Sequence, residues 1–244
     1  KQQSMLTVCI ATYNGEKYIR QQLESILKQI SETDEIIISD DGSKDRTLDI
    51  VKEIGDKRIC VYNHIKRKAK FNIDYATANF ENALTKAKGD IIILSDQDDV
   101  WLDNKVETIV KTLDNNDMVM SDCHVTDERL NIIHQSYYKD CRRFEQSLWY
   151  NFHHPSFLGS CMAFRREVLR RAFPFPKYGV GHDLWLGMVG LRYYRFAFID
   201  TPLMNYRRHS SSVTDGGKEN HTSLWFKISY RLYVLKAMLG LIKP

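Results

Sequence analysis

The stretch GDIIILSDQDDVW, from Gly89 to Trp101, decides how the rest of the chain is interpreted. Its four consecutive apolar residues, Ile91 to Leu94, predict a strand that is buried on both faces. Three carboxylates, Asp96, Asp98 and Asp99, follow it after Ser95. Open parallel sheets bind ligands beyond the carboxyl ends of their strands, and clustered acids repel one another unless a cation or a proton lies among them. The stretch therefore predicts a site for Mg²⁺ or Mn²⁺ and substrate phosphates at a sheet edge. A solvated acidic turn before the next helix is the alternative.

Two further apolar runs end in polar turns of the same kind. Residues 35–39, EIIIS, are followed by Asp40 and Asp41, and the run at 6–11 is followed by Thr12, Tyr13, Asn14 and Glu16. A helix N-cap is a sufficient explanation for Asp45, which precedes a helical pattern, but not for the two acids at the strand end. Three strands that each end in ligand-capable side chains strengthen the prediction of a binding site at one edge.

These turns contain the motifs TVCIATYNGEKYI, DDGSKDRT and LSDQDDVW. In this order and spacing they resemble the inverting glycosyltransferases of family 2, which have the GT-A fold. The form DQDDVW and the pair Asn79-Phe80 are similar to the bacterial rhamnosyltransferase-like branch. The resemblance covers roughly residues 5–210, which is nearly the whole chain.

The alternation of strands and helices predicts an α/β fold with right-handed crossovers and a Rossmann-like, mainly parallel sheet flanked by helices. Strands are expected at 6–11, 35–39, 58–62, 90–95 and 117–122, and helices at about 16–29, 46–54, 74–88 and 103–114. The resemblance implies one GT-A domain over residues 1–220. Residues 1–122 would be its nucleotide-sugar-binding half and residues 123–220 its acceptor half.

The second half of the chain has a less regular pattern. We expect a short hairpin at 124–135, a helix or loop at 142–152, a strand at 160–164 followed by a helix to residue 172, a helix at 181–191 and a strand at 196–199. Residues 221–244 read as an amphipathic C-terminal helix. This helix is expected to pack on the domain or on a partner, with peripheral contact to a membrane surface as the alternative.

The resemblance also implies roles for individual residues. Asp98 and His209 would bind the Mn²⁺ or Mg²⁺ ion, and Asp96 would face the donor ribose or sugar. Residues that would contact the nucleoside are Thr12, Tyr13, Asn14, Glu16, Asp40 and Asp41, and Asn79 is a further donor contact. Arg207 and Arg208 would meet the diphosphate. A solvated basic loop is an equally good interpretation of these two arginines.

The catalytic base is expected in the sequence GHDLW, residues 181–185. Family members usually carry an acidic pair there whose last Asp is the base, which implies that Asp183 takes this role. His182 replaces the first acid and is interpreted as a neighbour or an acceptor contact. An N-cap is the alternative for Asp183. The small residues at 210–217 suggest a lid that closes over bound donor.

Composition limits the remaining possibilities. A formal charge of +4 is too small to indicate nucleic-acid binding. Five scattered cysteines without a CxxC pair favour a reducing cytoplasm. No uncharged run approaches the ~20 residues of a spanning helix. The family resemblance implies a metal-dependent inverting glycosyltransferase that moves a sugar from a UDP- or dTDP-sugar to a glycan or lipid-linked acceptor, in bacterial cell-surface polysaccharide synthesis. A sugar-1-phosphate nucleotidyltransferase and a non-catalytic sugar-nucleotide-binding protein are the alternatives.

Overall fold

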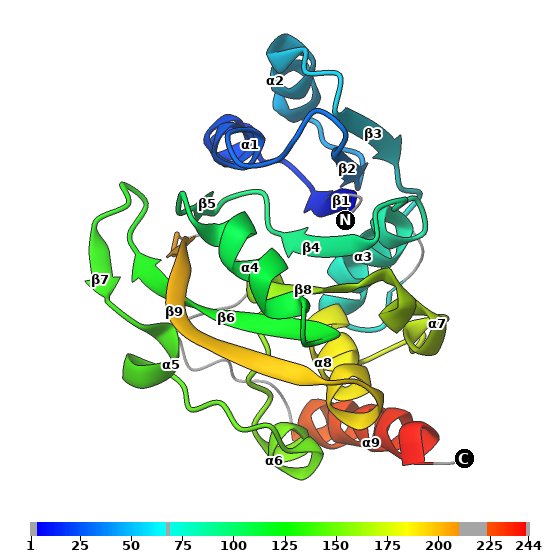
Figure 1. The fold of residues 1–244 in the computed structure, drawn as a ribbon. Helices are drawn as coiled ribbons and strands as arrows, with labels where there is room; N and C mark the ends of the chain where they lie inside the picture. Colours follow the sequence, from blue (N-terminus) through cyan, green and yellow to red (C-terminus); the bar gives the residue numbers. More distant parts are fainter. Residues whose placement is uncertain (1–3, 67–68, 210–223, 243–244) are drawn as a thin grey trace.

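A single curved sheet organises the computed structural model, which describes residues 4–66, 69–209 and 224–242 (Figure 1). The strand order is β3-β2-β1-β4-β8-β6-β9-β5, with β7 paired to the carboxyl-terminal end of β6, beyond its pairing with β8. The strands are β1 (Leu6–Thr12), β2 (Glu35–Asp40), β3 (Ile59–Asn63), β4 (Ile91–Ser95), β5 (Val100–Trp101), β6 (Met118–Thr126), β7 (Ile132–His134), β8 (Met162–Arg165) and β9 (Phe196–Arg207).

Helices cover the sheet. In the described ranges they are α1 (Ile19–Leu27), α2 (Thr47–Ile54), α3 (Ile73–Leu84), α4 (Lys105–Leu113), α5 (Tyr137–Asp140), α6 (Leu148–His153), α7 (Leu169–Ala172), α8 (His182–Tyr193) and α9 (Leu224–Ile242). Helix α3 packs on β1 and β2, and α4 packs on β6, β8 and β9. Helix α8 contacts α3, α6, α7 and α9, so that α9 closes the lower end of the molecule in Figure 1. The result is the layered α/β architecture that the alternating pattern predicts.

The predicted parallel core is confirmed. Strands β1 to β4 pair in parallel, and the register places Thr12 opposite Asp40 and Ile10 opposite Ser95. The carboxyl ends of β1, β2 and β4 therefore lie at the same edge. Both faces of β2 and β4 are buried, as expected for apolar runs inside a parallel sheet. Strand β8 is antiparallel to both of its neighbours, β4 and β6.

The structure differs from the expectation most clearly at β9. The strand was expected at 196–199. It instead continues to Arg207, beside β6, with two shifts of register. Pro202 lies opposite Asp122 at the first shift, where a strand tolerates the missing N–H. This extension carries Arg207 to the edge at which the acids lie.

The remaining expectations of the second half are confirmed in outline. Strands β6 and β7 form the hairpin, and α6 occupies part of the segment expected as helix or loop. The short elements β5 and α5 were not predicted. Helix α9 buries Val234, Met238 and Leu241 and contacts α6 and α8, so it packs on the domain as expected. No helix in the parts of the chain that the structure describes is long and apolar enough to cross a membrane.

Candidate active site

The ends of β1 and β2 are tied together by backbone and side-chain hydrogen bonds. The Asp41 amide donates to the carbonyl of Thr12 at 2.9 Å, and the Thr12 hydroxyl donates to Asp40 Oδ1 at 3.1 Å. Asp40 Oδ2 accepts the amides of Gly42 and Ser43, both at 2.9 Å. The Asp40 carboxylate is thus occupied in shaping the loop after β2. Of the two adjacent acids, Asp41 is the one placed to contact a ligand.

Asp41 lies in a small charged cluster with residues that follow β3. His64 Nδ1 lies 2.5 Å from Asp41 Oδ1, and Lys66 Nζ lies 3.9 Å from Asp41 Oδ2. The same ammonium lies 3.3 Å from the centroid of the Tyr13 ring, which is 47% exposed. An exposed aromatic face beside a carboxylate with a fixed orientation is suited to a planar base. The sequence analysis missed His64 and Lys66, although the edge rule that singled out the other strand ends applies equally to β3.

Asn14 and Glu16 hold the loop before α2. Asn14 Oδ1 accepts the Lys44 amide at 2.8 Å, and Glu16 Oε2 accepts the Arg46 amide at 2.8 Å. Asp45 accepts the amides of Glu16 and Thr47, both at 3.0 Å, but the N-cap position of α2 is Arg46, so Asp45 is not the N-cap that the sequence suggested. Asn79 donates to the Thr12 carbonyl at 3.2 Å. Asn14, Glu16 and Asn79 thus hold the loops after β1 and β2 in place. Their expected contacts with a nucleoside or donor remain predictions.

The three acids after β4 form one cluster. Asp96, Asp98 and Asp99 each offer an oxygen within 4.8 Å of the others. Burial raises the pKa of Asp96 to about 7, with further contributions from the charges of Asp98 and Asp183. Burial and the neighbouring charges raise the pKa of Asp99 well above its usual range. Asp99 Oδ2 is buried without a hydrogen-bond partner in the described chain. Such a set fits a divalent cation, which would relieve the repulsion and satisfy this oxygen.

His209 completes the cluster. Its Nε2 lies 2.7 Å from Asp98 Oδ2, and its ring packs on Tyr18 with 4.8 Å between the centroids. The two residues expected to bind the metal are therefore in direct contact, although 110 residues separate them in the sequence. The segment at 210–217, expected to form a lid, lies outside the described residues.

Arg207 has a different environment from the one expected. It is 4% exposed, and its guanidinium donates to the carbonyl oxygens of Asp98 and Glu128 and to the Gln21 side chain, at 2.6–2.8 Å. Its amide also donates to Asp99 Oδ1 at 3.1 Å. Arg207 therefore fixes the acidic turn on β9. The Arg208 guanidinium donates to the Tyr206 hydroxyl at 3.2 Å and is less buried, which makes it the better candidate for a diphosphate.

Lys105, which the sequence analysis did not single out, is fully buried below the acidic cluster. Its ammonium donates to the Ser160 carbonyl at 2.8 Å and lies 5.0 Å from the centroid of the Trp101 ring. Burial lowers the pKa of Lys105, while the charges of Asp99 and Asp96 oppose this effect. A buried ammonium here offsets part of the negative charge of the cluster.

Asp183 lies in the first turn of α8, close enough to the cluster for its charge to raise the pKa of Asp96. The cap position of α8 is Gly181, and Asp183 Oδ1 accepts only the amide of the next residue, Leu184, at 2.7 Å. The side chain therefore does not cap the helix in the usual way. Since the Asp183 carboxylate makes few hydrogen bonds within the described chain, it can accept a proton from a substrate.

The ring of His182 is stacked on Phe80, with 4.0 Å between centroids and 23° between planes. Both ring nitrogens are buried without a hydrogen-bond partner in the described ranges. Burial lowers the pKa of His182, so the imidazole is neutral at pH 7. A buried neutral imidazole next to Asp183 agrees with the expected role as a neighbour of the base, since one nitrogen can donate and the other accept.

Gly159 makes room for this ring. A Cβ atom at residue 159 would lie 2.6 Å from His182 Nε2 and 3.5 Å from the Asp183 Cβ. We expect Gly159→Ala to displace the ring and the first turn of α8, lowering transfer about 10- to 100-fold because a small misplacement of reacting groups is costly. Thermal unfolding and kinetics of the purified variant check this. Gly240→Ala is the matched control, because its Cβ meets nothing within 4 Å. Wild-type turnover in Gly159→Ala would show that the contact is unimportant.

Comparison with known proteins identifies the family. The model named Glycosyl transferase family 2 matches residues 7–173, which is more than half of the chain. The chain belongs to glycosyltransferase family 2. The match contains the turns after β1, β2 and β4, so the family resemblance of the three motifs is confirmed.

Relatives from several bacteria are similar to this family 2 member. An uncharacterised glycosyltransferase of Rickettsia typhi is 27% identical over 91% of this chain and 70% of its own length. The dTDP-rhamnosyl transferase RfbG of Shigella flexneri is 36% identical over 43% of this chain and 36% of its own. WfaP of Escherichia coli, a UDP-Glc:α-D-GlcNAc-diphosphoundecaprenol β-1,3-glucosyltransferase, is 38% identical over 42% and 38%. The matched regions thus span from about a third to 70% of these relatives.

Solved structures confirm the GT-A fold. Residues 1–349 of Staphylococcus aureus TarS in complex with UDP superpose with a TM-score of 0.67 at 18% identity, over 97% of this chain and 66% of the TarS 1–349 chain. Glucosyl-3-phosphoglycerate synthase of Mycobacterium tuberculosis, in complex with Mn²⁺, UDP and glucosyl-3-phosphoglycerate, has a TM-score of 0.60 at 18% identity, over 98% and 80%. The predicted GT-A architecture with a mainly parallel sheet is therefore correct.

Proposed function

We propose that this chain carries the catalytic domain of a metal-dependent inverting glycosyltransferase. It would move a sugar from a UDP- or dTDP-sugar to a glycan or lipid-linked acceptor in bacterial cell-surface polysaccharide synthesis. The observation that carries the proposal is the meeting of three groups at one sheet edge: the Asp41 cluster, the acids after β4 and Asp183. The names of RfbG and WfaP support these two donors and, for WfaP, a lipid-linked acceptor.

The nucleoside would bind beside the ring of Tyr13 and the carboxylate of Asp41, which His64 orients. The Lys66 side chain, which lies between the ring and the carboxylate, would move aside. The diphosphate would then extend toward Asp98 and His209, with Arg208 as an additional cation. A divalent ion held by Asp98 and His209, with Asp96 and Asp99 in support, would neutralise the charge that develops on the leaving diphosphate. Arg207 keeps the acidic turn in place by its three side-chain hydrogen bonds.

Asp183 would accept the proton of the attacking hydroxyl. The acceptor oxygen forms its bond to the anomeric carbon as the bond to the diphosphate breaks on the opposite face, so the configuration inverts. A positioned carboxylate typically accelerates such a step ~10²–10⁴-fold. The neutral His182 would help to orient the acceptor or the base, since its nitrogens are buried beside Asp183.

Residues 1–220 would form the transferase domain, and its acceptor half would present Asp183. All five cysteines are free thiols, which supports the cytoplasmic side of the membrane as the site of the reaction. Release of free nucleotide from a panel of UDP- and dTDP-sugars with Mn²⁺ tests the function. A nucleotidyltransferase would instead release pyrophosphate from a nucleoside triphosphate and a sugar-1-phosphate. A binding protein would turn over neither substrate.

The raised pKa values at the cluster predict how metal binding depends on pH. Asp96, with a pKa of about 7, is partly protonated at neutral pH, and burial and the neighbouring charges raise the pKa of Asp99 well above its usual range, so a bound cation must displace protons. The affinity for Mn²⁺ should therefore fall as the pH is lowered from about 8 to 6, by about tenfold per pH unit for each proton released. Carboxylates with ordinary pKa values would be charged throughout this range. Calorimetric titration of Mn²⁺ in the presence of UDP measures the effect, and a constant affinity would contradict it.

A further inference from the structure

Helix α9 carries apolar side chains on two opposite faces. One face, with Val234, Met238 and Leu241, is buried against the domain. The other carries Trp225, Ile228, Leu232 and Leu239, which are 79%, 42%, 60% and 49% exposed. Their spacing of three, four and seven residues places them on a single stripe of the helix. The position of α9 on the domain leaves this stripe uncovered in the described chain.

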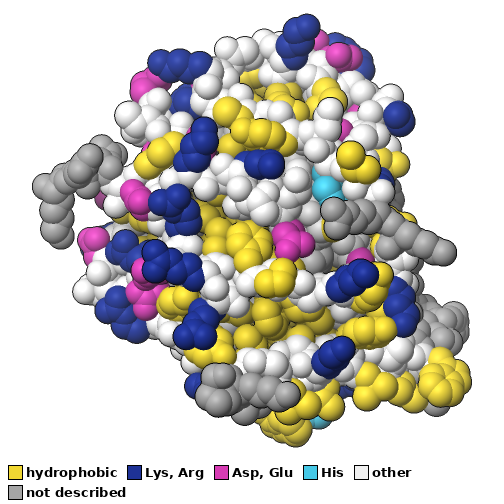
Figure 2. Space-filling model, turned by 90° about the vertical axis from the view of Figure 1, so that its right-hand side faces the viewer, with side chains coloured by type: hydrophobic (Ala, Val, Ile, Leu, Met, Phe, Trp, Pro, Cys, Tyr) yellow, Lys and Arg dark blue, Asp and Glu magenta, His cyan; other side chains and the backbone are white. Residues whose placement is uncertain are grey.

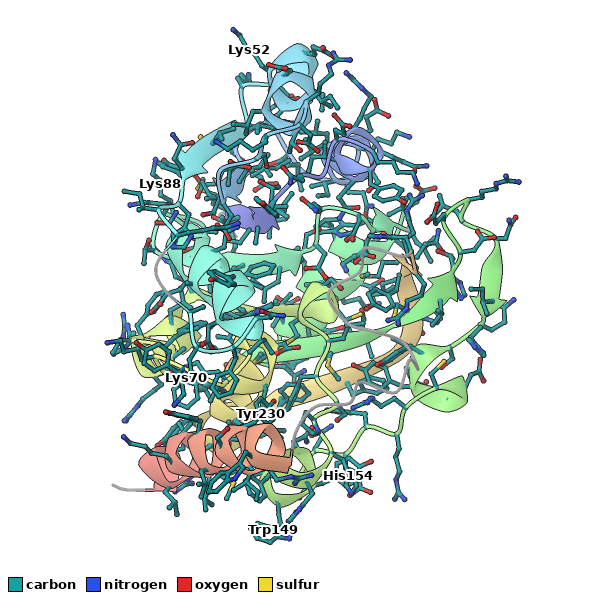
Figure 3. The ribbon with its side chains drawn as sticks, turned by 180° about the vertical axis from the view of Figure 1, so that it is seen from behind. Lys52, Lys70, Lys88, Trp149, His154 and Tyr230 are labelled. Carbon is teal, nitrogen blue, oxygen red and sulfur yellow. The ribbon has the colours of Figure 1, made fainter. Side chains whose placement is uncertain are left out.

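A second exposed aromatic side chain lies at the same end of the molecule. Trp149, on α6, is 62% exposed, and α6 packs directly against α9. Figure 2 shows hydrophobic side chains along the lower edge of the molecule. Figure 3 shows Trp149 and His154 beside α9, at the end opposite to Lys52 and Lys88. The stripe and Trp149 together form what we call the lower apolar face.

The charges around the lower apolar face are almost all positive. Helix α9 has three basic residues and no acidic residue, and the exposed side chains of Arg231 and Lys236 lie on the two flanks of the stripe. Residues 141–154 add two arginines, two histidines and one acid, Glu145. Arg142, Arg143, His153 and His154 line a cavity of about 350 Å³. These two segments carry a formal charge equal to the +4 of the whole chain.

We propose that α9 and α6 form a docking surface for an anionic phospholipid bilayer. Trp149 and the stripe of α9 would enter the interface, where tryptophan and leucine side chains are stabilised, and the flanking basic residues would meet lipid phosphates. The helix would lie in the plane of the membrane, because its inner face is packed on the domain. This surface was only an alternative in the sequence analysis, and the exposed stripe now favours it.

The same helix also reaches the acceptor side of the active site. It contacts α8, which carries Asp183 in its first turn, and burial, followed by the Asp183 charge, raises the pKa of Tyr230 on α9 to about 12. A membrane under α9 would therefore bring lipid-linked sugars close to the catalytic carboxylate. In this respect the inference deepens the proposed function. Its test needs neither donor nor acceptor, so the two proposals can fail independently.

Vesicle sedimentation tests the docking surface. The wild type should bind vesicles of phosphatidylcholine that contain phosphatidylglycerol much more tightly than phosphatidylcholine alone. Binding should shift the tryptophan emission to the blue, because Trp101 and Trp185 are already buried and only the two exposed tryptophans change environment. Trp149→Ser, Trp225→Ser and Leu232→Ser combined should lower binding at least about tenfold. Arg231→Gln with Lys236→Gln should lower it at least about fivefold on anionic vesicles.

Matched controls lie away from the lower apolar face. Ile65→Ser with Ile133→Ser removes two exposed apolar side chains, and Lys52→Gln with Lys88→Gln removes two exposed charges. Both double variants should bind as the wild type does. Failure of the wild type to bind anionic vesicles at low salt would overturn the proposal, as would undiminished binding by the triple variant. Self-association of the wild type that the triple variant abolishes would assign the face to a second copy instead.

Discussion

Asp183→Asn should lower the turnover number for sugar transfer by at least ~10² while the affinity for donor stays near that of the wild type. The change keeps the shape of the side chain and its hydrogen bond from the Leu184 amide, but removes the basicity. An acceptor hydroxyl has a pKa far above neutrality, so its proton must leave as the new bond forms. Steady-state kinetics with a verified acceptor, together with calorimetry of donor binding, measures both quantities.

Asp49→Asn is the matched control, because Asp49 also lies in the first turn of a helix and is exposed. This variant should transfer sugar at the wild-type rate. Near-normal turnover in Asp183→Asn would assign the base to another residue. Loss of donor binding along with turnover would place Asp183 in the donor site. Asp183 is close enough to the acidic cluster for this, because its charge contributes to the raised pKa of Asp96.

Removal of the divalent cation should have an effect of comparable size. We expect EDTA to abolish transfer and Mn²⁺ or Mg²⁺ to restore it. Asp98→Ala should lower transfer by at least about 10³-fold, since neutralising a leaving diphosphate contributes several kcal/mol. The variant should still fold, because alanine keeps the carbonyl oxygen that Arg207 binds. The substitution also removes the repulsion between the Asp98 carboxylate and those of Asp96 and Asp99.

Asp103→Ala is the control for general loss of negative charge near the cluster, since Asp103 is exposed in the turn before α4. It should leave both transfer and metal dependence unchanged. Full transfer in EDTA would contradict the role of a cation. Full transfer by Asp98→Ala with metal present would show that residues other than Asp98 bind the cation.

The central strands and their polar ends could be predicted from the sequence because both depend on local patterns. Apolar runs such as Ile91 to Leu94 bury a strand in any parallel sheet, and the chain must then leave the sheet at its carboxyl edge. The acids at that edge were found for this reason. His64 follows the same rule but lacks a recognised motif, and it was therefore missed.

The packing of the site could not be predicted in this way. Arg207 was expected to meet the diphosphate or to lie in a solvated loop, and Lys105 was not considered. Basic side chains are seldom buried. Each is buried only because distant segments supply acceptors, such as Glu128 and Gln21 for Arg207. The extension of β9 through Pro202 depends likewise on its pairing with β6. Such contacts arise from tertiary structure and leave no periodic signal in the sequence.

Calorimetric titration of UDP and dTDP into the wild type, with Mn²⁺ and then with EDTA, tests most directly whether the acidic edge is a metal-dependent nucleotide site. We predict binding with Mn²⁺, and loss of at least about tenfold in affinity in EDTA. Asp98→Ala with Mn²⁺ should resemble the wild type in EDTA. Nucleotide binding of equal strength in all three conditions would contradict the assignment of the cluster as the metal site.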